Sequence, residues 1–495
     1  MISSNKEGIM NANTQYNKIS FYLNGKEQSA SIPAGLSTLD WLNKHRNMYG
    51  TKCSCNEGDC GACTVVIAYP REGSIVYEAI NSCLYPAAKL HGRHLITIEA
   101  IGTPEELHPI QEAMLKHHGT QCGYCTPGFV MSMFAMFAMQ SHPDKESIFS
   151  ALEGNLCRCT GYQSILDAAM EISENYSPDT IVPQWCREVE PMLFSFKQAA
   201  YMGEADNANP GLVQKYYLPE DMSSLFDVCD SEPAARFIAG GTDIVVQMNI
   251  SRREFPVLID LCRIDALNKL YLQRDGLHIG AMISYSQLFE SGIVKSDYPA
   301  LHELINKIAS RQIRNFGTIV GNIANASPIG DSLPLLLALD ARLVLASRQG
   351  ERIIPLSSFF IAYRKTALQQ NEIVKELVLP IIPRGNYVHS IKSAKRKSVD
   401  ISSVVTAINL AWDGDRICSA RLALGGVAAT TVLSGKFGEL VIGKAASELD
   451  SVSIAEAIAA DYAPLSDVRG SAEYRTKLII EHIAIYIEHI KGRQA

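Results

Sequence analysis

Four cysteines near the N-terminus have the spacing of ligands to an iron–sulfur cluster. Cys55, Cys60 and Cys63 lie on one short loop, and Cys83 follows twenty residues later. This C-x4-C-x2-C…C pattern is that of the plant-type [2Fe-2S] loop. Two glycines in the loop remove Cβ obstruction, so backbone N–H groups can reach cluster sulfurs. Zinc is the alternative, but zinc ligands usually come as C-x2-C pairs separated by a finger. The sequence therefore favours a [2Fe-2S] cluster.

A second group of cysteines follows, as Cys122-Gly123-Tyr124-Cys125 and Cys157-Arg158-Cys159. Each pair precedes helical sequence, so the positive end of a helix dipole is expected to face a negatively charged thiolate site. Taken alone, this spacing could serve zinc or a redox dithiol instead. Beside a ferredoxin-type loop, it predicts a second iron–sulfur site.

Two glycine-rich loops further along the chain could hold a pyrophosphate. An extended segment, 236–239, runs into Gly240-Gly241-Thr242-Asp243, and a second loop is Gly317-Thr318-Ile319-Val320-Gly321-Asn322, followed by 326–331. A glycine turn between strand and helix presents backbone N–H groups to phosphate. It can equally be an ordinary turn, but two such loops in one domain favour phosphate binding.

Composition limits the class of protein that carries these motifs. The 495 residues are 47% hydrophobic and 20% charged, with a formal net charge of −7, which suits several globular domains. Nine of the thirteen cysteines fall between Cys53 and Cys159, and in a reducing compartment such clustering indicates metal rather than disulfides. We find no secretory signal in residues 1–15, no apolar run near the ~18 residues that span a bilayer and no concentrated basic stretch. A cytoplasmic protein without membrane or nucleic-acid partners is expected.

The cysteines require two small domains to position them. Residues 16–103 form a strand-rich domain that opens with a hairpin around Asn24-Gly25 and continues with strands at 64–69 and 74–80. Residues 104–176 are helical, with Asp144 predicted to cap a helix over 145–153. The proline-containing segment 177–211 is expected to be a linker that crosses a surface.

The glycine loops fall in a third domain, residues 212–384, in which short strands at 236–239, 257–260 and 277–279 alternate with helices. A fourth domain, residues 385–495, has strands near 402–411 and 419–427, then helices at 453–459 and 474–490. The predicted fold class is α+β, multidomain.

The order of these motifs resembles the xanthine dehydrogenase and aldehyde oxidase family of molybdenum hydroxylases. The resemblance implies a plant-type ferredoxin (β-grasp) domain, a four-helix [2Fe-2S] domain, a vanillyl-alcohol-oxidase-like FAD domain and a C-terminal α+β domain like that of CO dehydrogenase flavoprotein. It implies one cluster on Cys55, Cys60, Cys63 and Cys83 and another on Cys122, Cys125, Cys157 and Cys159. It also implies FAD contacts at Phe237, Ile238, Ala239, Gly240, Gly241, Thr242, Asp243, Ile244, Thr318, Ile319, Val320, Gly321, Asn322, Asp331, Val374 and Lys392.

One position departs from the family pattern. The family commonly has Gly-Gly-Asn where this chain has Val320-Gly321-Asn322. The extra Cβ at Val320 is expected to crowd the flavin or to require a small backbone adjustment.

The resemblance also implies a division of labour between subunits. The molybdopterin domains that carry out hydroxylation are expected on a separate large subunit, so no catalytic residue for the substrate is assigned here. This chain then is the small subunit of a heterotetramer of two small and two large subunits. It passes electrons from hypoxanthine or xanthine oxidation, which yields urate, through two clusters to FAD and then NAD. An aldehyde or other N-heterocycle hydroxylase, oxygen as final acceptor, and an iron–sulfur redox sensor are the alternatives.

The residue before Cys122 is the expected contact with the large subunit. From the sequence alone, a hydrogen bond within its own helix end is the simpler role for Gln121. In the family the matching glutamine faces the pterin. We therefore expect Gln121 and the helical domain to dock on the large subunit.

Overall fold

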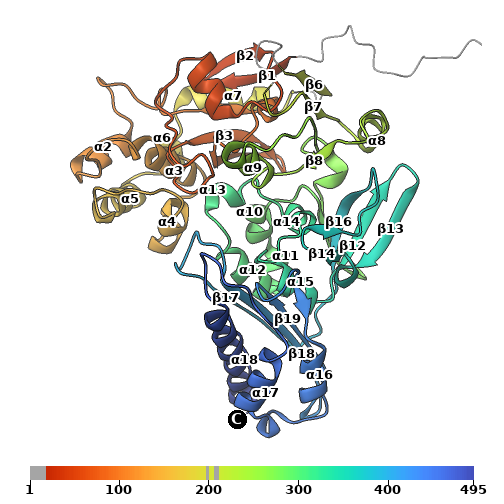
Figure 1. Cartoon of the computed structure of the whole chain (residues 1–495). Helices are drawn as coiled ribbons and strands as arrows, with labels where there is room; N and C mark the ends of the chain where they lie inside the picture. The colour runs from red at the N-terminus through yellow and green to blue at the C-terminus, as the bar shows by residue number, and fades with distance from the viewer. Residues whose placement is uncertain (1–17, 197–199, 206–210, 495) are drawn as a thin grey trace, which may run out of the picture.

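The computed structural model describes residues 18–196, 200–205 and 211–494. Figure 1 shows the ferredoxin-like part (red) and the helical part (orange) at one end, and the C-terminal domain (blue) at the other. The third domain (green to cyan) lies between them. The described chain is α+β and multidomain, as the sequence predicts.

The first domain is a five-stranded mixed sheet. Its strand order is β2-β1-β5-β3-β4, with β1 (Ile19–Leu23), β2 (Lys26–Ala30), β3 (Thr64–Arg71), β4 (Ser74–Asn81) and β5 (His94–Ile96). Asn24 and Gly25 have φ of 50° and 80°, so the expected tight hairpin joins β1 to β2. Short helical turns α1 (Thr38–Asp40), η1 (Trp41–His45) and η2 (Ala87–Leu90) complete the domain.

Both faces of this sheet are buried, which explains the continuous apolar run in β3. Side chains alternate between the faces of a strand. Val66 and Ala68 pack into a core shared with the helical domain, whereas Val65 and Ile67 pack into a core shared with the third domain. The ferredoxin-like sheet is therefore the layer between the two neighbouring domains.

The second domain contains four helices: α2 (Pro109–Lys116), α3 (Thr126–Met139), α4 (Lys145–Leu152) and α5 (Gln163–Asn175). The Asp144 side chain accepts a hydrogen bond from Ser147 N, which confirms the predicted cap of α4. Helix α3 is buried along most of its length because it lies between the other helices and the ferredoxin-like sheet.

The segment from 177 to 211 differs from the plain linker that its prolines and polar residues suggest. It contains α6 (Pro178–Ile181), α7 (Gln184–Leu193) and β6 (Tyr201–Glu204). Helix α7 buries Cys186, Val189 and Leu193 in the helical-domain core, and β6 pairs with the third domain. Pro178 occupies the first turn of α6, a position where proline favours a helix. The prediction of a plain linker is wrong for this segment, because its proline content does not show where each proline lies within a helix.

The third domain has two sheets. In the first, ordered β6-β7-β9-β8, strands β7 (Lys215–Leu218), β9 (Val257–Asp260) and β8 (Arg236–Ile238) are joined through α8 (Met222–Ser231) and α9 (Ile244–Ser251). The second is ordered β10-β11-β16-β12-β13; its strands are β10 (Leu270–Gln273), β11 (Gly276–Gly280), β12 (Arg342–Ser347), β13 (Gly350–Pro355) and β16 (Ile373–Leu379).

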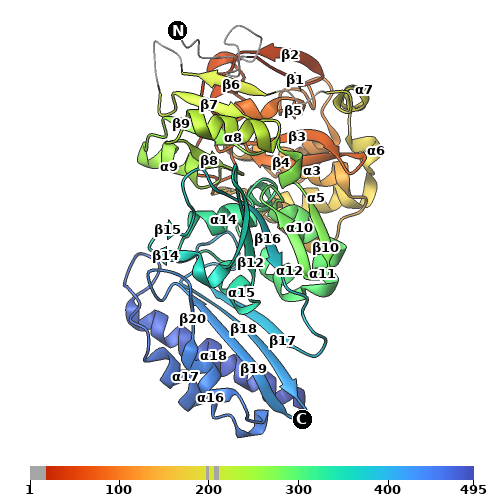
Figure 2. The ribbon, with the colours of Figure 1, turned by 90° about the vertical axis from the view of Figure 1, so that its right-hand side faces the viewer.

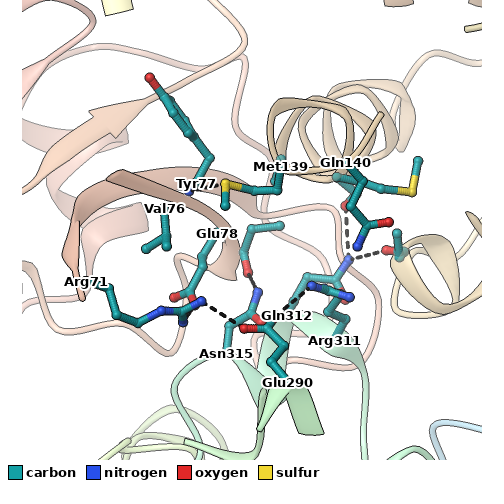
Figure 3. Close-up of a pocket in the computed structure, with 15 residues that line it drawn as sticks. Arg71, Val76, Tyr77, Glu78, Met139, Gln140, Glu290, Arg311, Gln312 and Asn315 are labelled. Atoms are coloured by element: carbon teal, nitrogen blue, oxygen red, sulfur yellow. Dashed lines mark hydrogen bonds and ion pairs between the residues drawn. The ribbon is translucent and has the colours of Figure 1, made fainter. Parts of the chain in front are cut away.

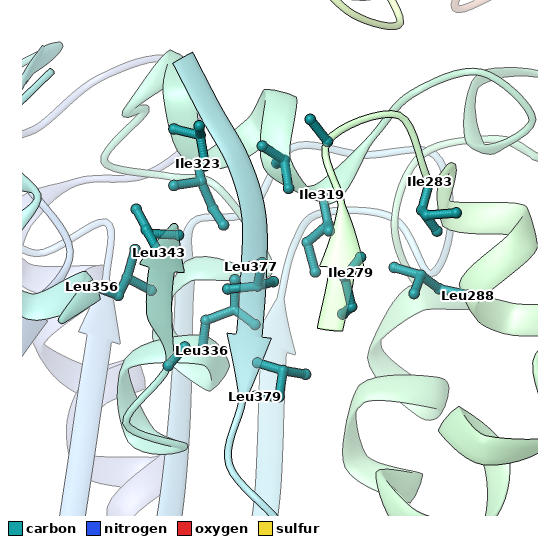
Figure 4. Close-up of a cluster of buried hydrophobic side chains, with 14 of the residues drawn as sticks. Ile279, Ile283, Leu288, Ile319, Ile323, Leu336, Leu343, Leu356, Leu377 and Leu379 are labelled. Atoms are coloured by element: carbon teal, nitrogen blue, oxygen red, sulfur yellow. The ribbon is translucent and has the colours of Figure 1, made fainter. Parts of the chain in front are cut away.

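Helices cover the second sheet and enclose the apolar core that Figure 4 shows. They are α10 (Tyr285–Glu290), α11 (Gly292–Asp297), α12 (Pro299–Ile305), α13 (Arg311–Arg314), α14 (Ile319–Asn325) and α15 (Leu333–Ala338). The remaining short elements are η3 (Asp265–Leu267), η4 (Leu356–Ser358), β14 (Phe360–Ala362) and β15 (Lys365–Thr366).

The fourth domain is an antiparallel sheet with helices on its outer face (Figure 2). Strands β17 (Tyr387–Ser393), β18 (Val404–Asp413), β19 (Arg416–Gly425) and β20 (Val432–Leu433) are followed by α16 (Gly435–Val441), η5 (Ala446–Glu448), α17 (Ser451–Ala459) and α18 (Ala472–Gln494). Ile408 and Leu422 face these helices, whereas Ala407 and Ala423 belong to the core of the third domain. Within the described residues, no helix is long and apolar enough to cross a membrane.

Candidate cluster and flavin sites

The first four cysteines lie together in two pairs. The Sγ atoms of Cys63 and Cys83 are 3.2 Å apart, and the thiol of Cys60 hydrogen-bonds to that of Cys55. Cys55 Sγ also accepts the N–H groups of Asp59 and Cys60, each at 3.3 Å. The Cys60 thiol and these N–H groups lower the pKa of Cys55 to about 5. The site thus stabilises a thiolate before any metal is considered.

The loop around these cysteines depends on backbone conformations that favour glycine. Gly58 and Gly61 have φ of 86° and 67°. A Cβ on Gly61 would lie 2.4 Å from the carbonyl oxygen of Gly154, so the helical domain approaches the loop backbone directly. Cys63 and Cys83 are almost fully buried.

The second four cysteines also form two pairs. Cys159 and Cys122 have their Sγ atoms 3.6 Å apart, and Cys125 and Cys157 hydrogen-bond through their thiols. Burial raises the pKa of Cys157, but the Thr160 hydroxyl at 3.2 Å and nearby N–H groups outweigh it and lower that pKa to about 7. Cys125 directly precedes α3, as expected, whereas residues 160–162 separate Cys159 from α5.

Pairs of thiols are the arrangement that a two-iron cluster needs, because each iron takes two of the four protein ligands. Both cysteine groups therefore fit a [2Fe-2S] cluster in the character and pairing of their donors.

The two groups differ in exposure. Cys122 and Cys159 are exposed, and Gln121 beside them is exposed as well. Tyr124, Leu156 and other large side chains around this group are also exposed, at 44% and 39% for these two. The second cysteine group is therefore accessible from the surface, whereas Cys63 and Cys83 are not.

A hydrogen bond joins the two cysteine loops. The N–H of Leu156, next to Cys157, donates to the carbonyl oxygen of Cys60 at 2.9 Å. A single backbone hydrogen bond therefore connects Cys60 of the first group to the residue that precedes Cys157 of the second.

The two glycine-rich loops lie against each other, as flavin binding would require. A Cβ on Gly240 would lie 2.1 Å from the carbonyl oxygen of Phe316, so this contact admits only glycine. Gly241 has φ of 90°. Thr318 Oγ1 accepts the N–H of Gly321 at 2.9 Å. From the other loop, Asp243 Oδ2 accepts the amide of Asn325 at 3.0 Å.

The other predicted flavin residues are distributed around these loops. Lys392 Nζ lies 2.7 Å from Asp331 Oδ2, so this lysine is paired across the third and fourth domains. Ile238, Ile319, Val320 and Val374 are buried, and the last three belong to one core. The extra methyl groups of Val320 are therefore accommodated by core packing. Phe237, Ala239, Thr242, Ile244 and Asn322 complete the loops and their helix starts.

Two residues that sequence reasoning missed tie the flavin loop to the first cysteine site. Lys89, 4% exposed, donates to the carbonyl oxygen of Ala239 and pairs with buried Asp260 at 3.3 Å. Asn249, on the helix after Gly240-Gly241, donates to the carbonyl oxygen of Cys83 at 3.1 Å. A lysine within the apolar stretch 87–90 was the only signal available in the sequence.

Two cavities of the described structure are not lined by any of the predicted flavin residues. One of about 250 Å³ lies where the first three domains meet and is lined by Arg71, Glu78, Glu290 and Gln312 among others (Figure 3). Another of about 710 Å³ lies between the first and third domains, beside Lys89 and Phe316. None of the eight predicted cysteine ligands lines either cavity.

Comparison with known protein families agrees with this organisation. Residues 21–87 match the 2Fe-2S iron-sulfur cluster binding domain and residues 97–170 the [2Fe-2S] binding domain. Residues 211–382 match the FAD binding domain in molybdopterin dehydrogenase, and residues 389–489 match the CO dehydrogenase flavoprotein C-terminal domain.

Individual proteins resemble the chain to different extents. A xanthine dehydrogenase of Blastobotrys adeninivorans is 33% identical over 94% of this chain, which spans 40% of that protein. A carbon monoxide dehydrogenase structure from Hydrogenophaga pseudoflava, 28% identical, has a TM-score of 0.53 and matches 56% of this chain and 97% of that one. Quinoline 2-oxidoreductase from Pseudomonas putida 86, 26% identical, has a TM-score of 0.51 over 56% of this chain and 95% of that one.

The fold and the two kinds of site define an oxidoreductase with iron–sulfur and FAD-binding electron-transfer domains. The four matched domains give the chain the small-subunit architecture of the xanthine dehydrogenase/CO dehydrogenase family of molybdenum hydroxylases.

Proposed function

We propose that this chain holds two [2Fe-2S] clusters and one FAD. The first cluster is assigned to Cys55, Cys60, Cys63 and Cys83, and the second to Cys122, Cys125, Cys157 and Cys159. The single observation that carries the proposal is the pairing of thiols at both sites, with Cys63 and Cys83 3.2 Å apart and Cys122 and Cys159 3.6 Å apart. FAD is assigned to residues 237–244 and 318–322 with Asp331, Val374 and Lys392.

The clusters would pass single electrons, and the flavin would collect two and exchange a hydride. The chain's own residues would keep these groups at fixed positions and exclude water from them. Cys63 and Cys83 are shielded by the neighbouring domains. Lys89 holds the Ala239 carbonyl and so orients the flavin loop. Paired Lys392 and Asp331 would fix a charge at the flavin edge.

We infer that the chain is the electron-transfer subunit of a xanthine dehydrogenase. A large molybdopterin subunit would oxidise hypoxanthine or xanthine to urate, in a heterotetramer of two small and two large subunits, with NAD as the final acceptor. The name of the Blastobotrys adeninivorans relative and its match across 94% of this chain support this reading. The thirteen free cysteines suit a reducing cytoplasm.

A second candidate is the same role in a hydroxylase of another N-heterocycle or an aldehyde. The likeness of 56% of this chain to quinoline 2-oxidoreductase favours it. The redox-sensor alternative has less support, because a sensor has no need of an FAD-binding domain, which this chain has.

The test begins with the purified chain and continues with the assembled complex. About four iron atoms, equal acid-labile sulfide and one FAD are expected. Cys60→Ser should remove one paramagnetic signal of the reduced protein, and Cys157→Ser the other. Zinc without sulfide would reject both cluster assignments. With the large subunit, xanthine should reduce NAD; quinoline or an aldehyde as the better substrate would select the second candidate.

A further inference from the structure

A short segment of the third domain reaches both cysteine-bearing domains. Residues 310–316 contain α13 and directly precede the second flavin loop. Gln312 contacts the helical domain, and Asn315 donates to the carbonyl oxygen of Ala79 in the ferredoxin-like sheet at 2.7 Å. Figure 3 shows these two side chains at the junction of the three domains. The segment therefore links the flavin loop to both cysteine-bearing domains.

The amide of Gln312 is buried and makes its contacts in the helical domain. Its Nε2 donates to Ser132 Oγ and Asn155 Oδ1, both at 3.0 Å, and to the carbonyl oxygen of Ala151 at 3.2 Å. The side chain is fully buried. Gln312 therefore fixes which way the Asn155 amide points, because the oxygen of Asn155 faces two donors, Gln312 and Ser132.

Asn155 continues this chain of bonds to the first cysteine loop. Its Nδ2 donates to the carbonyl oxygen of Gly61 at 3.1 Å and to Thr64 Oγ1 at 3.3 Å. Gly61 lies between Cys60 and Cys63, and Asn155 lies two residues before Cys157. The buried side chain of Asn155 thus bonds to the backbone of the first cysteine loop, while Asn155 itself is part of the second cysteine loop.

Three glycines, Gly61, Gly128 and Gly154, let the two loops approach so closely that a Cβ on any of them would clash. A Cβ on Gly128 would lie 2.3 Å from the carbonyl oxygen of Gly61, and one on Gly154 would lie 2.1 Å from Gln312 Oε1. Close-packed backbones of this kind do not deform gradually. The spacing between the two loops is therefore set by contact, by the hydrogen bond from Leu156 N–H to the Cys60 carbonyl oxygen and by the direction of the Asn155 amide.

We propose that Asn155, oriented by Gln312, is a positioning residue that sets the separation of the two clusters. This inference rests on the cluster assignment of the proposed function. Electron transfer between two centres weakens steeply with distance, so a fixed gap fixes the rate. Because residues 310–316 lead into the flavin loop, the contact between Gln312 and Asn155 also fixes the position of the two clusters relative to the flavin loop.

The test is Asn155→Leu in the full chain, which keeps the number and branching of the side-chain heavy atoms and removes both hydrogen bonds donated to the first loop. In the reduced protein, each paramagnetic cluster splits the signal of the other by an amount that falls with the cube of their separation. We expect both clusters to remain, with a weaker or more widely distributed splitting and slower electron transfer from dithionite-reduced clusters to FAD. Gln312→Met should produce the same change to a smaller extent.

Asn315→Leu is the matched control. Asn315 is another buried amide of the same segment that bridges to the ferredoxin-like domain, but its contact is to β4 and not to a cysteine loop. We expect it to lower the thermal midpoint while leaving the splitting as in the unaltered protein. The same splitting in Asn155→Leu and Asn315→Leu would overturn the inference.

Two further results are separable. If Asn155→Leu loses a cluster, Gln312→Met decides, and an unchanged splitting in that variant overturns the inference. If the unaltered protein shows no pair of coupled clusters, the proposed function itself fails. The two failures are therefore distinguished by the unaltered protein alone.

Discussion

The two cysteine sites share their chemistry and differ in their surroundings. Cys63 and Cys83 lie at 2% and 1% exposure between three domains, whereas Cys122 and Cys159 lie on the surface of the helical domain. The first site is bonded to the third domain through Asn249, and the second is surrounded by exposed Tyr124 and Leu156. A buried site suits transfer within the chain, and an exposed one suits transfer from a partner.

The largest difference is expected when each site loses a ligand. Cys83→Ser and Cys122→Ser should each remove about two of about four irons. Cys83→Ser should also lower the thermal midpoint by several degrees, because its loop is packed among other domains, whereas Cys122→Ser should change it little. Iron analysis and calorimetry measure both effects. Equal midpoints in the two variants would contradict the comparison.

The contact between the first site and the flavin loop can be broken separately. Lys89→Met leaves buried Asp260 with the Tyr216 hydroxyl and the Cys262 N–H as donors. Removing one partner of a buried ion pair typically costs about 3–5 kcal/mol. We expect reduced FAD content with both clusters retained, measured by flavin release and iron analysis.

A paired substitution is the control for Lys89. Lys89→Met combined with Asp260→Leu removes the charge that Lys89 offset, so part of the stability should return, less the loss of the acceptor for the Tyr216 hydroxyl and the Cys262 N–H. Recovery of stability without recovery of FAD content would assign Lys89 a direct part in orienting the flavin loop. Unchanged FAD content in Lys89→Met would contradict that role.

Acid should weaken the ferredoxin-like domain through a buried histidine. Burial lowers the pKa of His94 from 6.5 to about 3, and its Nε2 accepts the N–H of Gly25 at 3.0 Å. Below pH 6.5 the unfolded chain binds a proton that the folded chain does not, so this stability is complete above pH 6.5 and is lost as the pH falls toward 3. At pH 5 the loss is ~2 kcal/mol.

His94→Gln should flatten the dependence of the thermal midpoint on pH between about 6.5 and 4, measured by calorimetry. His118→Gln, at an exposed position of the helical domain, is the control and should keep the slope. An identical slope in both variants would exclude His94 as the source.

The sequence predicted the parts that depend on local spacing. The cysteine patterns, the Asn24-Gly25 hairpin, the Asp144 cap and the strand at 257–260 are all read from neighbouring residues, and the structure confirms the last three. The cysteine assignments remain predictions, which the paired thiols at both sites support. The flavin loops were placed together by resemblance, and the backbone contact of Gly240 with Phe316 gives the physical reason.

What the sequence could not provide depends on residues far apart in the chain. Lys89 and Ala239, or Gln312 and Asn155, meet only because the ferredoxin-like sheet lies between two domains. Helices α6 and α7 were missed because their prolines resemble those of a linker, while the burial of Cys186 and Val189 needs the neighbouring core to be known. The effect of Val320 was likewise invisible until its side chain was placed in the core.

The smallest structural effect, and the most specific functional one, is expected at the exposed site. Gln121→Ala removes an exposed side chain next to Cys122, so both clusters, the FAD and dye reduction by NADH should be unchanged. In the complex with the large subunit, reduction of the clusters by xanthine should slow several-fold, because Gln121 is predicted to lie at the contact with that subunit. Gln184→Ala, an exposed glutamine of α7, is the control. Stopped-flow measurement of cluster bleaching distinguishes the two variants. An unaltered rate in Gln121→Ala would remove Gln121 from the contact, while an equal slowing in both would indicate a general loss of assembly and not a local electron path at the second site.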